Sequence, residues 1–211
     1  MSNIARAVAA LQYVKSRVPL DQSDNKSIRQ DLLPSDPQSQ TNRANKRLEM
    51  KAQLDKMRSH HRFPSAGKAT AKNVLYYGAF ALAAGAGNCL EMSCGTIWYL
   101  NEQGHFDYDM VYYPGTSGIN QGVRDHIFVV IGQRTDNDGN FPTDFGAWDA
   151  DAAICDVWGD VASPARDYPA RWRARMGNWQ TMGIVIANRL PTENMWMNVV
   201  DLPKKSYLTP G

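Results

Sequence analysis

A cysteine in the middle of the chain has sequence surroundings that favour a reactive thiol. Cys89 follows the run Gly85-Ala86-Gly87-Asn88, which ends one helical pattern, and it begins a second helical pattern that extends to about Asn101. A cysteine in the first turn of a helix faces backbone N–H groups and the positive end of the helix dipole, and both favour the thiolate. The same N–H groups can stabilise the oxyanion that forms when sulfur attacks a carbonyl carbon. The sequence therefore predicts that Cys89 is a nucleophile.

Each cysteine also has a simpler interpretation as a small buried residue, which is the usual place of a free cysteine. Cys94 lies inside the second helical pattern and Cys155 inside a strand pattern, so both fit this interpretation. Cys89 fits it less well because it stands at the start of a helix. Three cysteines cannot all pair, so at least one thiol is free, as expected in a reducing compartment or for a thiol with a chemical role.

A thiol nucleophile needs a general base, and the base needs a group that orients it. Of the four histidines, only His126 opens a strongly apolar strand pattern, where a ring can be held rigidly beside a helix start. Asp156 ends another apolar strand pattern, and a carboxylate there is costly to bury without a partner such as an imidazolium. Asp149, in a turn-like segment, is the alternative orienting residue. The predicted catalytic residues are therefore Cys89, His126 and Asp156, with Asp149 open as the third member.

No metal site and no cofactor site are predicted. The pair His60-His61 could ligate a metal ion, but no matching cluster of cysteines or aspartates lies nearby in the sequence. The chemistry of the predicted site therefore depends on protein side chains alone.

The spacing of apolar residues predicts the elements that would position this site. The first twenty residues repeat apolar side chains every three or four positions (Ile4, Val8, Leu11, Val14), which predicts an amphipathic helix. Residues 19–45 are polar, so we expect them to be loosely structured. Further helices are expected at about Arg43–His60, at Ala69–Ala84 with Ser65 as N-cap, and from Cys89 to Asn101. Strands are expected at Met110–Tyr113, His126–Gly132 and Ala152–Asp156, with a long hairpin connection at 135–146 and a last apolar run at Met182–Ile186.

Length and composition fit one globular domain with a tail. The chain has 211 residues, of which 43% are hydrophobic and 21% charged, and no run of 18 apolar residues predicts a membrane span. The start lacks the apolar core and cleavage site of a secretory signal peptide. Residues 1–70 hold 13 Lys and Arg against 6 Asp and Glu, but they lack the interleaved aromatic residues of a nucleic-acid-binding surface. We therefore expect no nucleic-acid partner.

Three ordered segments resemble the signatures of transglutaminase-like, papain-fold proteins. They are Gly87-Asn88-Cys89-Leu90-Glu91-Met92, Asp125-His126-Ile127-Phe128-Val129-Val130-Ile131-Gly132 and Ile154-Cys155-Asp156-Val157-Trp158. Over about residues 65–160 the chain is similar to bacterial secreted effectors and toxins, such as the AvrPphE (HopX) group and the deamidase domain of Pasteurella multocida toxin. Leu90 and Val157 depart from this pattern, which often has Gly after the cysteine and Pro after the aspartate.

The resemblance implies an α+β, papain-like or transglutaminase-like fold, in which the helix with the nucleophilic cysteine packs on an antiparallel sheet. It maps the triad of the family onto Cys89, His126 and Asp156. It also implies a polar, basic leader at 1–62, which would serve secretion or targeting, and a papain-like catalytic domain at 63–211. Because the leader contains no predicted triad member, we expect it to be dispensable for the chemistry.

The implied function is acyl transfer by a bacterial effector or toxin that reaches the cytoplasm of a host cell without a cleaved signal peptide. Because the similar proteins include deamidases, the expected substrate is a glutamine side chain of a host protein. Water as acceptor gives deamidation, and an amine gives transglutamination. Two alternatives stay open. One is a cysteine peptidase or peptidoglycan amidase of the same fold, and the other is a binding module with an inactive triad.

Overall fold

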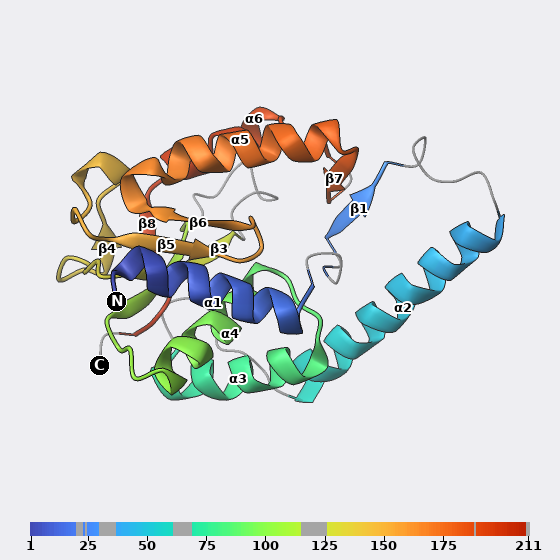
Figure 1. The fold of residues 1–211 in the computed structure, drawn as a ribbon, viewed down its shortest axis with the longest axis horizontal. Coiled ribbons are helices and arrows are strands. Elements are labelled where there is room, and N and C mark those ends of the chain that lie inside the picture. The colour runs from blue at the N-terminus through green and yellow to red at the C-terminus, as the bar shows by residue number, and fades with distance from the viewer. Residues whose placement is uncertain are drawn as a thin grey trace.

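The computed structural model of the chain describes residues 1–19, 23, 25–29, 37–60, 69–114, 126–187 and 189–209. These residues confirm the α+β class (Figure 1). Their helices are α1 (Asn3–Arg17), α2 (Pro37–His60), α3 (Ala71–Ala84), α4 (Cys89–Glu102), α5 (Tyr168–Thr181) and α6 (Asn194–Met197). Their strands are β1 (Lys26–Ile28), β2 (Tyr108–Tyr112), β3 (Ile127–Ile131), β4 (Asn140–Phe141), β5 (Ala153–Asp156), β6 (Val161–Pro164), β7 (Ile184–Ile186) and β8 (Lys204–Ser206).

Six strands form one antiparallel sheet in the order β4-β8-β2-β3-β5-β6. All five residues of β3 are buried, as in strands that are covered on both faces. Val129 of β3 pairs with Cys155 of β5, so the start of β3 and the end of β5 lie at the same end of the sheet. This register brings His126, which immediately precedes β3, close to Asp156, which ends β5.

Helices cover both faces of the six-stranded sheet. α4 packs on β3, α1 packs on β5 and β6, and α3 pairs with α4. Figure 1 shows these three helices on one side of the sheet and α5 on the other. The apolar side chains of both layers form one hydrophobic core with the sheet.

Local sequence determines where α4 begins. Gly85 ends α3 in the left-handed conformation, with a φ of 67°, which glycine adopts without steric cost. Asn88 is the N-cap of α4, and the Glu91 carboxylate accepts the backbone N–H of Asn88 at 2.9 Å. This is the reciprocal arrangement of a capping box, which defines a helix start. As predicted, Cys89 is therefore the first residue of the helix.

The observed elements differ from the predicted ones in several places. α3 begins at Ala71 with Thr70 as its N-cap, and the predicted cap Ser65 lies outside the described residues. α2 begins at Pro37, and both this start and β1 lie in the segment expected to be loosely structured. The sequence does not predict α5 or β6, because Trp, Arg and Pro alternate after residue 158 and obscure the apolar period. It does not predict β8 either, because Lys204–Ser206 contains only polar residues.

The leader expected at 1–62 is not separate from the rest of the structure. Ala7, Ala10 and Val14 of α1 are fully buried in the same core as β3 and β5. The buried face of α1 differs from the predicted stripe, since Val8 is 38% exposed and alanines face the core. Small side chains allow α1 to approach the sheet closely. In addition, β1 pairs with β7, so the boundary predicted at residue 62 cuts through one packed unit.

Removal of residues 1–62 is therefore expected to cause unfolding or aggregation, because loss of α1 exposes apolar surface of α4, β5 and β6.

Single substitutions in α1 test the same role. Val14→Asp buries a carboxylate at a cost of several kcal/mol. The matched change Val8→Asp lies at an exposed position of the same helix and should alter stability by less than about 0.5 kcal/mol. Thermal unfolding followed by circular dichroism measures the stability of the truncated chain and of the two variants. Equal losses, or a truncated chain that unfolds cooperatively, would contradict this role of α1.

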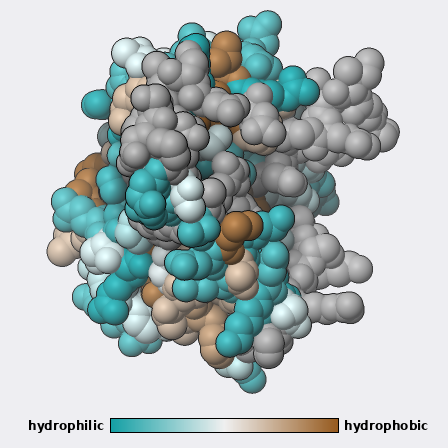
Figure 2. Space-filling view, turned by 90° about the vertical axis from the view of Figure 1, so that its right-hand side faces the viewer, coloured by the Kyte–Doolittle hydropathy of each residue, from teal (hydrophilic) through white to brown (hydrophobic). Residues whose placement is uncertain are grey.

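α2 extends away from the sheet (Figure 1). Met50, Leu54 and Met57 are buried in the core. Figure 2 views the molecule from the side on which α2 lies, and hydrophilic residues dominate the coloured surface there. Within the described ranges, no helix combines the length and the apolar character needed to cross a bilayer.

Candidate active site

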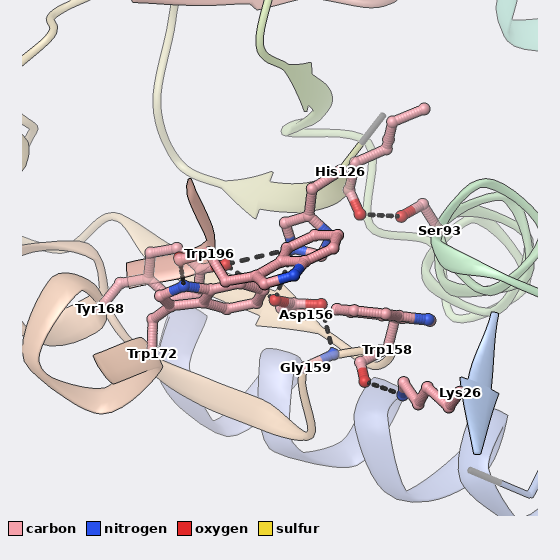
Figure 3. A network of polar contacts seen from close by, with 10 residues as sticks. Lys26, Ser93, His126, Asp156, Trp158, Gly159, Tyr168, Trp172 and Trp196 are labelled. Carbon is pink, nitrogen blue, oxygen red and sulfur yellow. Dashed lines mark hydrogen bonds and ion pairs between the residues drawn. The ribbon is translucent and has the colours of Figure 1, made fainter. Parts of the chain in front are cut away.

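A buried histidine–aspartate pair lies at the end of the two central strands. The Nε2 atom of His126 is 2.8 Å from Oδ2 of Asp156. His126 is 3% exposed and Asp156 1% exposed, so water screens the pair little. Figure 3 shows the imidazole ring directed at the carboxylate. The structure thus brings together two of the three predicted catalytic residues.

Further hydrogen bonds hold the carboxylate of Asp156 in its ionised form. The backbone N–H of Gly159 donates to Oδ1 at 2.8 Å, and the hydroxyl of Tyr168 donates to Oδ2 at 2.7 Å. A Cβ atom at position 159 would lie 2.3 Å from Oδ2, so this close approach requires glycine. Burial acts against ionisation, but the adjacent His126 and these two donors together hold the pKa of Asp156 below its ordinary value. Asp156 is therefore a fixed anion that can orient the imidazole.

Tyr168 is a positioning residue that the sequence analysis did not identify. Its hydroxyl oxygen lies 2.7 Å from Oδ2 of Asp156 and 3.4 Å from Nε2 of His126. Tyr168 is the first residue of α5, and the proline that follows it is typical of a helix start. That proline is the one local signal that could have located the helix, but it does not indicate contact with Asp156.

Tyr168→Phe is expected to move acid unfolding to a higher pH. Because the pKa of Asp156 is lowered by folding, the ionised carboxylate contributes stability above its ordinary pKa, and this stability is lost as the pH falls through the folded pKa. Loss of the tyrosine hydroxyl raises that folded pKa and removes a hydrogen bond to a charged group, which contributes about 1.5–3 kcal/mol. Acid titration followed by circular dichroism measures the midpoint.

Tyr113→Phe is the matched control for this prediction. Tyr113 is also buried, but its hydroxyl has no hydrogen-bond partner among the described residues. Its removal should leave the acid midpoint unchanged. An equal shift in both variants would show that the Tyr168 hydroxyl does not act through Asp156.

Cys89 lies at the end of α4 that adjoins the His126–Asp156 pair. Ser93, one turn further along α4, donates its hydroxyl to the carbonyl oxygen of Ile127 at 3.1 Å, and Ile127 follows His126 (Figure 3). Cys89 itself is 8% exposed. Burial, the negative charge of Asp156 and the proximity of other ionisable groups, Cys89 among them, raise the pKa of Tyr168 well above its ordinary value. The thiol therefore lies within electrostatic reach of the group that positions Asp156.

A bridge through Ser23 links the start of α4 to the aromatic residues around His126. The Ser23 hydroxyl donates to Oδ1 of Asn88 at 2.8 Å, and it accepts the Nε1–H of Trp158 at 3.2 Å. The Trp158 ring lies 5.2 Å from the His126 ring, measured between centroids. Since Asn88 directly precedes Cys89, this bridge connects the backbone at Cys89 to the Trp158 ring beside His126.

Aromatic rings enclose His126 and keep the site apolar. The centroids of Trp172 and Phe128 lie 4.6 Å and 6.0 Å from that of His126. The Nε1–H of Trp172 donates to the carbonyl oxygen of Trp196 at 2.7 Å, which holds this ring in place. An apolar surrounding strengthens the electrostatic interaction of His126 with its carboxylate.

The other candidate residues lie apart from this arrangement. Asp149 is exposed, and its backbone N–H donates to the side chain of Gln133, so it does not orient His126. Burial raises the pKa of Cys94 well above its ordinary value and that of Cys155 to about 12. Both groups remain thiols at neutral pH, as expected for structural cysteines.

No cluster of three or more His, Cys, Asp or Glu residues that could hold a metal ion is present in the part of the chain that the structure describes. Two residues named in the sequence analysis, His61 and Asp125, lie outside the described residues, as does the side chain of His60.

No family model, no curated protein and no solved structure matches this chain. The function is therefore inferred from the geometry of the site itself.

Proposed function

We propose that this protein is a Cys-His-Asp acyl-transfer enzyme with a papain-like, transglutaminase-like fold. The observation that carries the proposal is the buried His126–Asp156 pair at the end of the sheet against which the Cys89 helix packs. A nucleophile at a helix start, with a base and an orienting carboxylate on adjacent strands, is the arrangement that thiol-dependent acyl transfer needs.

The two nitrogen atoms of His126 have different roles in this mechanism. Nε2 carries a proton and donates to Asp156, because the carboxylate can only accept. Nδ1 is then the basic nitrogen that takes the proton from the Cys89 thiol. The positive charge that develops on the ring is stabilised by Asp156, whose own ionisation is favoured by Gly159 and Tyr168.

Acyl transfer then proceeds in two steps. The Cys89 thiolate attacks the carboxamide carbon, and backbone N–H groups in the first turn of α4 stabilise the oxyanion. The C–N bond breaks, the leaving ammonia takes the proton from His126, and a thioester forms on Cys89. A water molecule, deprotonated by His126, attacks the thioester and releases the acid and the free thiol.

The proposed substrate is a glutamine side chain of a protein in a host cell. Support for this choice comes from the resemblance of the three site segments to secreted effectors and toxins that include deamidases. In the same proposal, the N-terminal residues also direct secretion, in addition to their structural role in the core. An amine that replaces water in the second step would give transglutamination.

Intact-mass analysis of candidate host proteins after incubation with the enzyme tests the proposal. Deamidation adds about one dalton per glutamine, an amine acceptor gives a crosslink, and proteolysis gives fragments, because each outcome is a different fate of one thioester. The Cys89→Ala variant is the control for chemical deamidation. Cleavage of host proteins or of peptidoglycan would indicate a peptidase or amidase. If no product forms and Cys89 reacts with iodoacetamide no faster than Cys94, the protein is a binding module.

A further inference from the structure

A lysine from the N-terminal segment lies beside the proposed site and takes no part in the steps above. Lys26, the first residue of β1, donates from Nζ to the carbonyl oxygen of Trp158 at 2.5 Å (Figure 3). The Nζ atom also lies 4.1 Å from the centroid of the Trp158 ring and 4.4 Å from that of Trp179. A carbonyl oxygen and two indole faces are all favourable partners of a positively charged ammonium group.

The strand that carries Lys26 is held on both sides. Lys26 pairs with Ile186 in the β1–β7 sheet, and the backbone N–H of Ala187 donates to the carbonyl oxygen of Asn25. Toward the site, the bridge through Ser23 connects this segment to Asn88, the residue before Cys89. The position of the Lys26 ammonium group relative to the site is therefore determined by the fold.

Ionisable groups from several elements lie within electrostatic reach of this ammonium. They are Asp156 at the end of β5, Cys89 at the start of α4, Asp160 in the turn after β5, and Arg175 on α5. Burial lowers the pKa of Lys26 to about 7. Asp156, the Cys89 thiol when it is ionised, and Asp160 act in the opposite direction, and Arg175 adds to the lowering. Near neutral pH both the ammonium and the neutral amine are therefore populated.

We propose that Lys26 is a positioning residue of the active site, whose positive charge stabilises the thiolate of Cys89. The inference rests on the proposed nucleophilic role of Cys89. It makes the N-terminal segment part of the catalytic unit as well as of the core. A positive side chain beside a thiol favours loss of the thiol proton, and in this site it also offsets the opposite effect of the Asp156 carboxylate.

The proposal has a characteristic pH dependence. Below about pH 7 Lys26 is charged and assists ionisation of Cys89, whereas above this pH the assistance decreases as the amine loses its proton. Two interacting groups titrate together, so the reactivity of Cys89 should rise over a wider pH range than a single ionisation would allow. Without the charge, Cys89 should follow a single ionisation with a higher midpoint.

Alkylation of Cys89 by iodoacetamide tests the effect of the Lys26 charge. The rate is measured from pH 6 to pH 9 by peptide mass spectrometry on the full-length protein. Lys26→Met should lower the rate about tenfold near pH 6.5, the effect of a rise of one pKa unit in the thiol, and should approach the wild-type rate near pH 9. Lys26→Arg keeps a positive charge at every pH and should restore the rate near pH 6.5.

Lys15→Met is the matched control. The Lys15 ammonium is 2.5 Å from Oδ1 of Asp160, so it anchors the same turn that Lys26 contacts, but it is partly exposed to solvent. Its loss should leave the pH profile of Cys89 unchanged. A slower reaction in Lys15→Met of the same size as in Lys26→Met would overturn the proposal, because anchoring of the turn would then explain both.

Superimposable pH profiles of the wild type and Lys26→Met would likewise overturn it. If Lys26→Met does not fold, as judged by circular dichroism, the Lys26→Arg variant tests the proposal instead. The alkylation rate of Cys89 in Lys26→Arg should follow a single ionisation shifted to lower pH. A pH profile identical to that of the wild type would contradict the role of the charge. The proposed function fails in a different way, when wild-type Cys89 reacts no faster than Cys94.

Discussion

Cys89→Ala and His126→Ala are each expected to abolish turnover while the protein stays folded. Cys89 would form the thioester, and His126 would move every proton in the reaction, so neither step proceeds without them. In a catalytic unit of this kind, loss of one member costs on the order of 10⁶ in kcat, about as much as loss of all members. The double variant should therefore be no slower than either single variant, as measured by ammonia release or by the mass of the product.

Cys94→Ala is the control for Cys89→Ala. Cys94 lies on the same helix, is fully buried, and has a pKa raised by burial, so its thiol does not ionise near neutral pH. Its replacement should change stability modestly and leave turnover within about tenfold of the wild type. A strictly additive double variant, or loss of the folded circular dichroism spectrum in Cys89→Ala or His126→Ala, would indicate structural roles instead.

Asp156→Asn is expected to reduce turnover by up to about 10⁴-fold. An asparagine keeps the size of the side chain but favours the wrong imidazole tautomer and no longer stabilises the imidazolium. Here the effect is reinforced because Asp156 lies 2.8 Å from Nε2 of His126 in a buried, aromatic surrounding. Steady-state rates of the folded variant and of the wild type measure this loss of turnover.

Asp149→Asn provides the comparison, with an expected loss of less than about tenfold, since this residue is exposed and lies in a turn. If the two variants lose the same small factor, Cys89 and His126 act as a dyad and Asp156 serves mainly the fold. If Asp149→Asn is the slower enzyme, the His126–Asp156 pair is not the catalytic arrangement.

The sequence by itself determined those features that depend on local interactions. The glycines before Cys89 predict the start of α4, and the Asn88–Glu91 cap that the structure shows acts within the same short run of residues. The apolar strand patterns that end at Asp156 and begin after His126 also predict β5 and β3 in nearly their observed positions. The prediction of Asp156 rests on the cost of burying a carboxylate at the end of a strand, and that of His126 on its place at the start of an apolar strand; both are local properties as well.

Only the tertiary structure decided which residues complete the site. Strand register brings Asp156, and not Asp149, to His126, since pairing of β3 with β5 aligns the start of one strand with the end of the other. Tyr168 and Lys26 are far from the triad in sequence and come from elements that the apolar pattern did not reveal. Likewise, α1 belongs to the core because alanines, which give a weak apolar period, allow it to pack closely on the sheet. Contacts between distant segments depend on packing and hydrogen bonding across the whole fold, and no local pattern of residues encodes them.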